Sequence, residues 1–321
     1  MSKIRISVLI LAAVLIFLSS VFIGPRIISP FDLSATDREI LFSIRLPRVV
    51  VAALVGMALG ASGAVLQGVL RNPLADPYIL GISSGASLTA AFGLLSGIYF
   101  FGRFTIPVTA FIGASAVSVI VGVLGMKRGK LWPERLLLAG IGLSFLFHAA
   151  LILLMSVSTD EGLRRAVLWM YGDISLADWS MIPSGLAVIA AGLAVCISRA
   201  KALNVLILGD EFSHSLGFSV NRERLLLFIS IALMTSASVS LGGIIGFIGL
   251  LMPHIARFSI GADSRVLIPV SAIGGGAFLC LADLIGRIIM PPMEIPSGIV
   301  TAIIGSPYFL YLLRRKDVLS I

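Results

Sequence analysis

The sequence predicts an all-α integral membrane protein with about ten transmembrane helices. The chain of 321 residues is 58% hydrophobic and 12% charged, whereas a soluble domain carries about 25% charged residues. Its mean hydropathy is +1.07. Uncharged windows of about 20 residues, the length of a helix that crosses a bilayer, recur along the chain. Lipid must therefore solvate much of the surface, and we expect a single transmembrane domain over residues 1–321.

The charge-free windows give the predicted spans in order. The first follows Lys3 and Arg5. Because this window is longer than the apolar core of a usual signal peptide and no clear cleavage site follows it, we interpret it as an uncleaved helix. The charge-free windows that hold one helix each are 6–25, 49–70, 77–102, 104–126, 136–159 and 179–198. The last two spans are about 266–289, an apolar run that contains Asp283, and 297–313.

The remaining window, 225–256, is 32 residues long. That is too long for one spanning helix and too short for two, since each needs about 20 residues. Helix-breaking residues lie in its second half, so we expect a full helix, a turn inside the protein and then a short or broken helix. The breaking residues are Gly242, Gly243, Gly246, Gly249 and Pro253.

The distribution of basic residues predicts the orientation. Ten spans place both termini on one side of the membrane. With the N-terminus inside, 16 of the 24 Lys and Arg residues fall on inner segments, and cytoplasmic loops carry such an excess. We expect a multi-pass protein of the cell (inner) membrane with both termini cytoplasmic. The net charge of +8 has the same source, and without a basic run interleaved with aromatic residues it does not indicate nucleic acid.

The residue patterns that several classes of function require are absent from this sequence. Cys196 and Cys280 lie inside apolar runs and suit packing, and the three histidines show no metal-ligand spacing. No P-loop and no nucleophile elbow occurs, which argues against an enzyme or an ATPase. Asp283, four residues before Arg287, should form an ion pair. Without further carboxylates at mid-membrane, an ion-coupled secondary transporter is the weaker alternative.

Small residues recur every four positions in the window 49–70. This spacing puts them on one helix face, where they allow another helix backbone to approach closely. Ordinary helix packing is one interpretation, and a seam that slides or lines a path is the other. The residues are Gly56, Gly60, Ala64 and Gly68.

The segment 203–224 is the longest polar inner loop of the predicted topology. Leu208, Phe212 and Leu216 share one face of a predicted short helix, with Asp210 and Glu211 in its first turn and Gly217 as its stop. Such an apolar stripe could rest on the membrane surface or dock into a groove of a partner.

Six segments together resemble the FecCD-type permeases of bacterial ABC importers, which take up iron–siderophores, haem and vitamin B12. They occur in the family's order over most of the chain. The matching pieces are IRLPR (44–48), GASGAVLQGVLRNPLADPYILGISSGA (60–86), LGDEFSHSLG (208–217), GFIGLLMPHIAR (246–257), LADLIGR (281–287) and PSGIVTAIIGSPYFLYLL (296–313).

The resemblance implies the type II ABC importer permease fold, in which one permease domain acts as a homodimer with the transport path between the two copies. Two ABC ATPase subunits, which hold the ATP and magnesium, would dock on one side, and no cofactor is expected in this chain. The segment 208–217, including Gly209, would couple to the ATPase. A substrate-binding protein would dock on the other side, on Arg45, Arg48 and Arg287. We expect a ferric siderophore as cargo, with vitamin B12 or haem as the alternatives.

Overall fold

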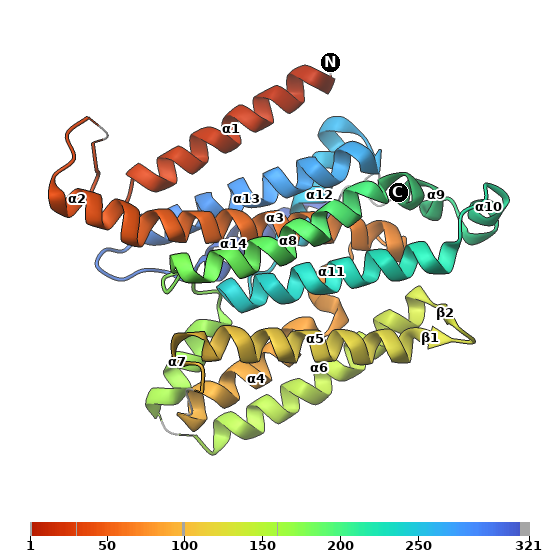
Figure 1. Cartoon of the computed structure of the whole chain (residues 1–321), viewed down its shortest axis with the longest axis horizontal. Helices are drawn as coiled ribbons and strands as arrows, with labels where there is room; N and C mark the ends of the chain where they lie inside the picture. Colours follow the sequence, from red (N-terminus) through yellow and green to blue (C-terminus); the bar gives the residue numbers. More distant parts are fainter. Residues whose placement is uncertain (1, 30, 98–99, 159, 315–321) are drawn as a thin grey trace.

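A computed structural model describes residues 2–29, 31–97, 100–158 and 160–314. Long helices lie side by side along the longest axis (Figure 1). Seven helices or helix runs are long and apolar enough to cross a membrane, and three shorter apolar helices accompany them. The ten helices are α1 (Ser2–Phe22), α3 (Leu46–Leu70), α4 (Ile82–Ser96), α5 (Thr105–Gly125), α6 (Pro133–Ser156), α8 (Ile182–Ser198), α11 (Val220–Gly242), α12 (Ile248–Ile260), α13 (Ser264–Ile288) and α14 (Ser297–Arg314).

Short elements gather at the two ends of this bundle (Figure 1). The end that we call the α2 end carries α2 (Ala35–Glu39), the π-helix η1 (Ile40–Arg45), η3 (Gly102–Phe104), α7 (Asp160–Met170) and η4 (Trp179–Met181). The opposite end, called the α10 end, carries α9 (Ala200–Ile207), α10 (Asp210–Ser215) and a hairpin of β1 (Met126–Lys127) and β2 (Lys130–Leu131). The turn η2 (Pro77–Leu80) connects α3 to α4.

Helix α3 forms the centre of the fold, and most of its residues are buried. It packs most extensively against α13 and also contacts α11 and α12. Gly56 and Gly275 lie where α3 and α13 cross, and a methyl group on either would overlap the carbonyl oxygen of the other. The backbones therefore meet directly, which is the role that small residues have in membrane helix pairs.

The third predicted span, 77–102, is shorter in the structure than in the sequence prediction. Its first four residues form the 3₁₀ turn η2, and Gly81, with φ of +76°, separates this turn from α4. Gly97, with φ of +65°, ends α4. A charge-free window shows which residues avoid water, but it does not show where left-handed glycines interrupt a helix.

The break expected within 225–256 is confirmed. Helix α11 ends at Gly242, and residues 243–247 are not helical before α12 begins. Gly243 and Phe247 both have φ of +70°, and the amide of Ile245 donates to the hydroxyl of Tyr78 at 3.2 Å. A side chain from elsewhere in the fold thus accepts a hydrogen bond from a backbone amide that the broken helix leaves unpaired, as the interior of a membrane protein requires.

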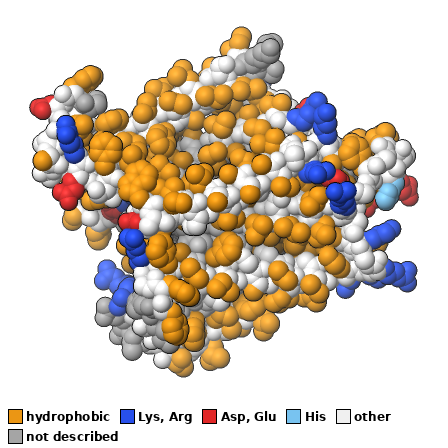
Figure 2. Space-filling view, viewed as in Figure 1, with side chains coloured by type: hydrophobic (Ala, Val, Ile, Leu, Met, Phe, Trp, Pro, Cys, Tyr) orange, Lys and Arg blue, Asp and Glu red, His pale blue; other side chains and the backbone are white. Residues whose placement is uncertain are grey.

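The surface matches a protein that lies in lipid. Figure 2 shows apolar side chains over the broad middle of the visible face and charged side chains mainly toward its two ends. Helix α1 begins on the α10 side of the molecule and runs toward the α2 end (Figure 1). The segment 315–321, part of the predicted cytoplasmic C-terminus, lies outside the described residues.

Candidate functional site

An exposed apolar surface lies at the α10 end, where the sequence predicts a docking segment. Leu208 is 65% exposed, Phe212 49% and Leu216 53%. The helix itself is shorter than the apolar spacing predicts, because it runs only from Asp210 to Ser215. Leu208 is the C-cap of the preceding helix α9, and Leu216 is the C-cap of α10. Gly209, with φ of +123°, makes the turn between the two helices.

Two arginines from distant helices hold α10 in place through Asp210. Arg224 of α11 donates from Nη2 to Asp210 Oδ1 at 2.8 Å, and Arg71, just after α3, forms a second ion pair with the same oxygen. Arg71 Nε also donates to the carbonyl of Leu206 at 2.9 Å. Burial alone raises the pKa of Asp210, but the two guanidinium groups hold it below its usual range. The carboxylate therefore stays charged at neutral pH.

Further contacts complete this anchor. Ser213 is buried, and its hydroxyl donates to the carbonyl of Val205 at 3.0 Å. Arg224 Nη1 donates to the carbonyl of Leu131 in the hairpin at 3.0 Å. Glu211, by contrast, is exposed. The two adjacent acids thus differ in role, since Asp210 faces the protein and Glu211 faces outward beside the apolar surface. The sequence predicts both in the first turn and does not distinguish them, because the ion pairs of Asp210 form only when the chain folds.

The three arginines predicted to dock a binding protein are buried at the α2 end. Arg48 Nη2 lies 2.9 Å from Asp283 Oδ1, and its Nη1 lies 2.6 Å from Glu294 Oε2. Arg287 Nε lies 3.0 Å from Asp283 Oδ2, as the spacing of four residues predicts. Arg45 donates to the carbonyl of Phe22 at 2.9 Å and to that of Arg26.

This cluster ties several helices together. Arg287 Nη2 also donates to the carbonyl of Ser20 at 2.8 Å, which connects α13 to α1. The exposed fractions of Arg45, Arg48 and Arg287 are 6%, 6% and 3%. Their guanidinium groups therefore bind acids and carbonyls of the same chain, although Arg287 Nη1 is buried without a hydrogen-bond partner. Their role in docking stays a prediction. The partners of Arg48 were missed in the sequence because they lie more than 230 residues away.

The four small residues of α3 face other helices of the same chain. Gly56 and Gly60 lie against the α13 backbone at Gly275 and Ser271, while Gly68 faces Leu203 of α9. Ala64 is 2% exposed. These contacts correspond to the packing interpretation of the spacing.

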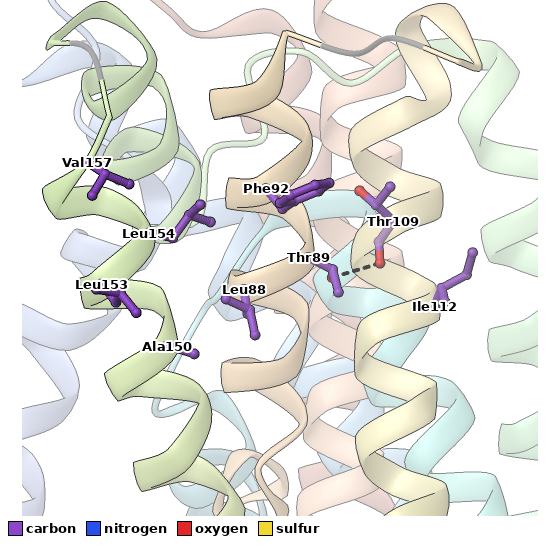
Figure 3. Close-up of a pocket in the computed structure, with 9 residues that line it drawn as sticks. All are labelled: Leu88, Thr89, Phe92, Thr109, Ile112, Ala150, Leu153, Leu154 and Val157. Carbon is purple, nitrogen blue, oxygen red and sulfur yellow. Dashed lines mark hydrogen bonds between the residues drawn. The ribbon is translucent and has the colours of Figure 1, made fainter.

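One cavity of about 620 Å³ opens between α4, α5 and α6 (Figure 3). Leu88, Phe92 and Leu154 are among its apolar lining residues. The Thr89 hydroxyl is already engaged, because it donates to the carbonyl of Thr109 at 2.8 Å. This lining suits hydrocarbon or another apolar surface, and it presents no charged group to a ligand.

Comparisons with known proteins agree with this fold. The model of the FecCD transport family matches residues 7–315. The chain is 41% identical over 289 residues to a cobalamin import system permease protein, BtuC, of Halobacterium salinarum, covering 90% of this chain and 77% of that one. It is 42% identical over 288 residues to the hemin transport system permease protein HmuU of Yersinia pestis, covering 87% and 84%.

A third relative is matched over nearly its full length. The iron(3+)-hydroxamate import system permease protein FhuG of Bacillus subtilis is 36% identical over 325 residues, which cover 97% of this chain and 96% of that one. A solved ABC transporter assigned to the metal-chelate type, in an inward-facing conformation, superposes with a TM-score of 0.88 at 30% identity, covering 98% and 99% of the two chains. The fold is thus that of a permease subunit rather than an ATPase, and the chain belongs to the FecCD transport family.

Proposed function

We propose that this chain is the permease subunit of an ATP-driven ABC importer that carries a metal chelate, a ferric siderophore, from a substrate-binding protein into the cytoplasm. The exposed α10 surface is the observation that carries the proposal. Leu208, Phe212 and Leu216 are apolar and 49–65% exposed, although ion pairs fasten α10 to the rest of the chain. A rigidly held apolar surface is suited to transmit force from a partner subunit.

The coupling partner is a pair of ABC ATPase subunits, which supply the ATP and magnesium. Glu211 and the apolar stripe contact the ATPase, while Gly209 and Gly217, both with positive φ, let the chain turn sharply on either side of α10. Asp210 transmits movement of α10 to α3 and α11 through its two arginines. The α10 end then faces the cytoplasm, with both termini on that side.

Two copies of the chain form the transport path. The cavity between α4, α5 and α6 is lined by apolar side chains and two threonines, so it does not suit a charged chelate on its own. Much of α6 is exposed, including Leu138, Phe145 and Leu153. A second copy packed on an exposed helical face would enclose a path that a single chain lacks.

The binding protein docks at the α2 end. Arg45, Arg48 and Arg287 lie beneath this surface, and the side chain of Glu294, which pairs with Arg48, is 39% exposed. Docking contacts that reach Glu294 would therefore act directly on the buried cluster.

Siderophore cargo is favoured because relatives named for iron(3+)-hydroxamate, Fe(3+)-citrate and siderophore transport match 95–97% of this chain. Vitamin B12 and haem are the alternatives, since relatives named for cobalamin and hemin are 41% and 42% identical, compared with 36–40% for those three relatives.

An ion-coupled carrier is the competing class of function. Within the described helices, Glu134 and Glu223 lie in first turns, and Asp283 is paired with Arg48 and Arg287. A carrier of that class uses ionisable groups near mid-membrane that can exchange their ion. The described helices therefore offer little for ion coupling, which favours the ATP-driven mechanism.

Reconstitution of the transporter tests the proposal. Vesicles that contain this chain, its ATPase and its binding protein should take up a ferric siderophore only when ATP is present. Replacing both Phe212 and Leu216 by Asp should abolish uptake and co-purification of the ATPase. Met126→Asp is the matched control, since Met126 is 40% exposed at the same end but lies in the hairpin. Uptake that survives the double substitution, or that follows an ion gradient without ATP, would refute the mechanism.

The cargo is tested separately from the mechanism. The same vesicles are supplied with ferric siderophore, cobalamin or haem, each with the partner binding protein. Selective uptake of the siderophore is the expected result. ATP-dependent uptake of cobalamin or haem instead would preserve the mechanism and change the substrate.

A further inference from the structure

A second cavity, of about 580 Å³, opens at the α2 end between α7, η4 and the start of α5. Its floor is apolar and includes Ile106, Leu168 and Trp169. Unlike the cavity in Figure 3, it also has charged walls, and the proposed transport function does not use them. The charged residues are Arg103, Arg165, Asp173 and Asp178.

The cavity lies at the level where spanning helices begin or end. Arg103 belongs to the 3₁₀ turn that leads into α5, and Asp178 caps the turn η4 that leads into α8. Leu241, in the last turn of α11, completes one wall. Trp179 stands beside Asp178 in sequence, and indole side chains gather at the headgroup level of membranes. The charged walls therefore lie at the boundary between headgroups and hydrocarbon.

An apolar furrow continues from this cavity toward the middle of the bundle. A neighbouring hollow of about 220 Å³ runs between α5 and α8, which both pack on α11. From Phe104 to Ile112, two of its lining residues, α5 rises about 12 Å. That is close to the hydrocarbon thickness of one bilayer leaflet, about 15 Å. The four residues shared by the two hollows are Pro107, Met181, Ser240 and Leu241.

The charged walls combine two arginines with two aspartates, so their formal charges cancel. Arg103 Nη1 lies 3.3 Å from Asp178 Oδ1, and the two side chains are 60% and 42% exposed. The amide of Ser180 donates to the same carboxylate oxygen at 2.8 Å, which fixes its position. A guanidinium and a carboxylate that are held together and open to solvent form a receptor for a zwitterion, because each can bind the opposite charge of the ligand.

We propose that this cavity and its furrow bind a phospholipid with a primary ammonium headgroup, such as phosphatidylethanolamine. The lipid phosphate contacts Arg103 and Arg165, the ammonium donates to Asp178 and Asp173, and one acyl chain lies in the furrow between α5 and α8. A purely anionic headgroup would meet the two aspartates without a positive charge. The quaternary ammonium of phosphatidylcholine has no N–H to donate to them.

Lipid retention by the purified full-length chain tests the site. Delipidated protein in detergent is mixed with equal amounts of phosphatidylethanolamine, phosphatidylcholine and phosphatidylglycerol, and bound lipid is counted by native mass spectrometry. The wild type should retain phosphatidylethanolamine at roughly tenfold preference, the effect of one charge-assisted hydrogen bond. Asp178→Asn should remove the preference over phosphatidylcholine, and because asparagine also caps helices, the turn η4 should persist.

Two further variants distinguish binding of the lipid headgroup from binding of the acyl chain. Val188→Trp fills the furrow away from the charged walls and should reduce retention of every phospholipid. Arg164→Gln is the matched control, since Arg164 is exposed on α7 beside Arg165 but does not line the cavity. Thermal unfolding verifies that each variant is folded. Equal retention of the three lipids by the wild type, a preference for phosphatidylglycerol, or an unchanged preference in Asp178→Asn would overturn the proposal.

Discussion

Asp210 shows how a single residue can hold a short helix in place. A six-residue helix is too short to be stable alone. Here its first residue joins α10 to Arg71 and Arg224, while Ser213 holds its middle. The apolar residues on its outer side can then remain exposed without collapsing onto the protein. The sequence predicts Asp210 as a partner of the helix dipole, whereas in the structure it anchors the exposed apolar surface.

Removing the charge of Asp210 should loosen α10 but leave the chain folded. We expect Asp210→Asn to weaken co-purification with the ATPase several-fold and to cost about 1 kcal/mol of stability, because the carboxylate is 47% exposed and solvent screens it. Glu211→Gln is the control for lost charge in the same helix turn. Equal effects of the two substitutions would remove the anchoring role of Asp210.

The pH dependence of this anchor follows from the direction of the shift. The pKa of Asp210 is lowered in the folded protein, so its contribution is fully present above the usual carboxyl pKa of about 3.9. It is lost as the pH falls through the lower folded value. The stability difference between wild type and Asp210→Asn should therefore be constant from pH 7 to about pH 5 and vanish in strong acid, as thermal unfolding at several pH values would show.

The buried arginines at the α2 end should contribute more to stability than the half-exposed ion pairs of Asp210. Removing one partner of a buried ion pair costs about 3–5 kcal/mol, because it leaves an uncompensated charge. We expect Arg48→Ala to cause a loss of this size, since it leaves the two carboxylates of Asp283 and Glu294 with only Arg287 to balance them. The exposed Arg38 on α2 is the control, and Arg38→Ala should change stability by less than about 0.5 kcal/mol. Thermal unfolding in detergent measures both.

The same variants distinguish support from direct docking. If Arg48 contacts the binding protein itself, Arg48→Glu should weaken binding more at low salt than at high salt. If Arg48 only supports the surface structurally, Arg48→Glu should unfold this region and weaken binding of the binding protein equally at every salt concentration. A stable Arg48→Glu variant with salt-dependent binding would favour direct contact.

At the scale of elements, the sequence predicts helices better than their interruptions. Lipid leaves a strong pattern in the sequence, so nine apolar windows predict the positions of all ten helices. The break after α11 was predictable because glycines and a proline fall in one overlong window. The 3₁₀ turn η2, the π-helix η1 and the hairpin were not, since their geometry depends on backbone angles and distant contacts such as Asn221 Oδ1 with the amide of Leu131.

Close packing of α3 against α13 predicts a contrast between two helical glycines. Gly56→Ala places a methyl group against the Gly275 carbonyl, and overpacking of this kind costs about 1–3 kcal/mol. Gly142 in α6 has nothing within 4 Å of the same position, so Gly142→Ala should be neutral or stabilising by up to about 1 kcal/mol. Thermal unfolding in one detergent compares them. A stable Gly56→Ala variant would mean that the two helices can separate without cost.

At the scale of the whole molecule, charge, exposure and packing divide the chain into three zones. The apolar middle faces lipid, the α10 end carries the exposed apolar surface, and the α2 end carries the buried ion cluster and the charged cavity (Figures 1 and 2). The basic residues predict on which side of the membrane each motif lies, and this orientation stays a prediction. The sequence does not show which arginines are occupied, because that depends on acids brought near only by folding.

The orientation of these zones can be measured in intact cells. Both cysteines of the chain are buried, so the natural protein should react little with a thiol reagent from outside. Thr36 on α2 and Ser215 on α10 are exposed at opposite ends. If the α10 end faces the cytoplasm, a maleimide that cannot cross the membrane should label Thr36→Cys in cells with a permeable outer layer, and should label Ser215→Cys only after lysis. The reverse pattern would place α10 outside, where no ATPase could reach it, and would overturn the coupling role of this surface.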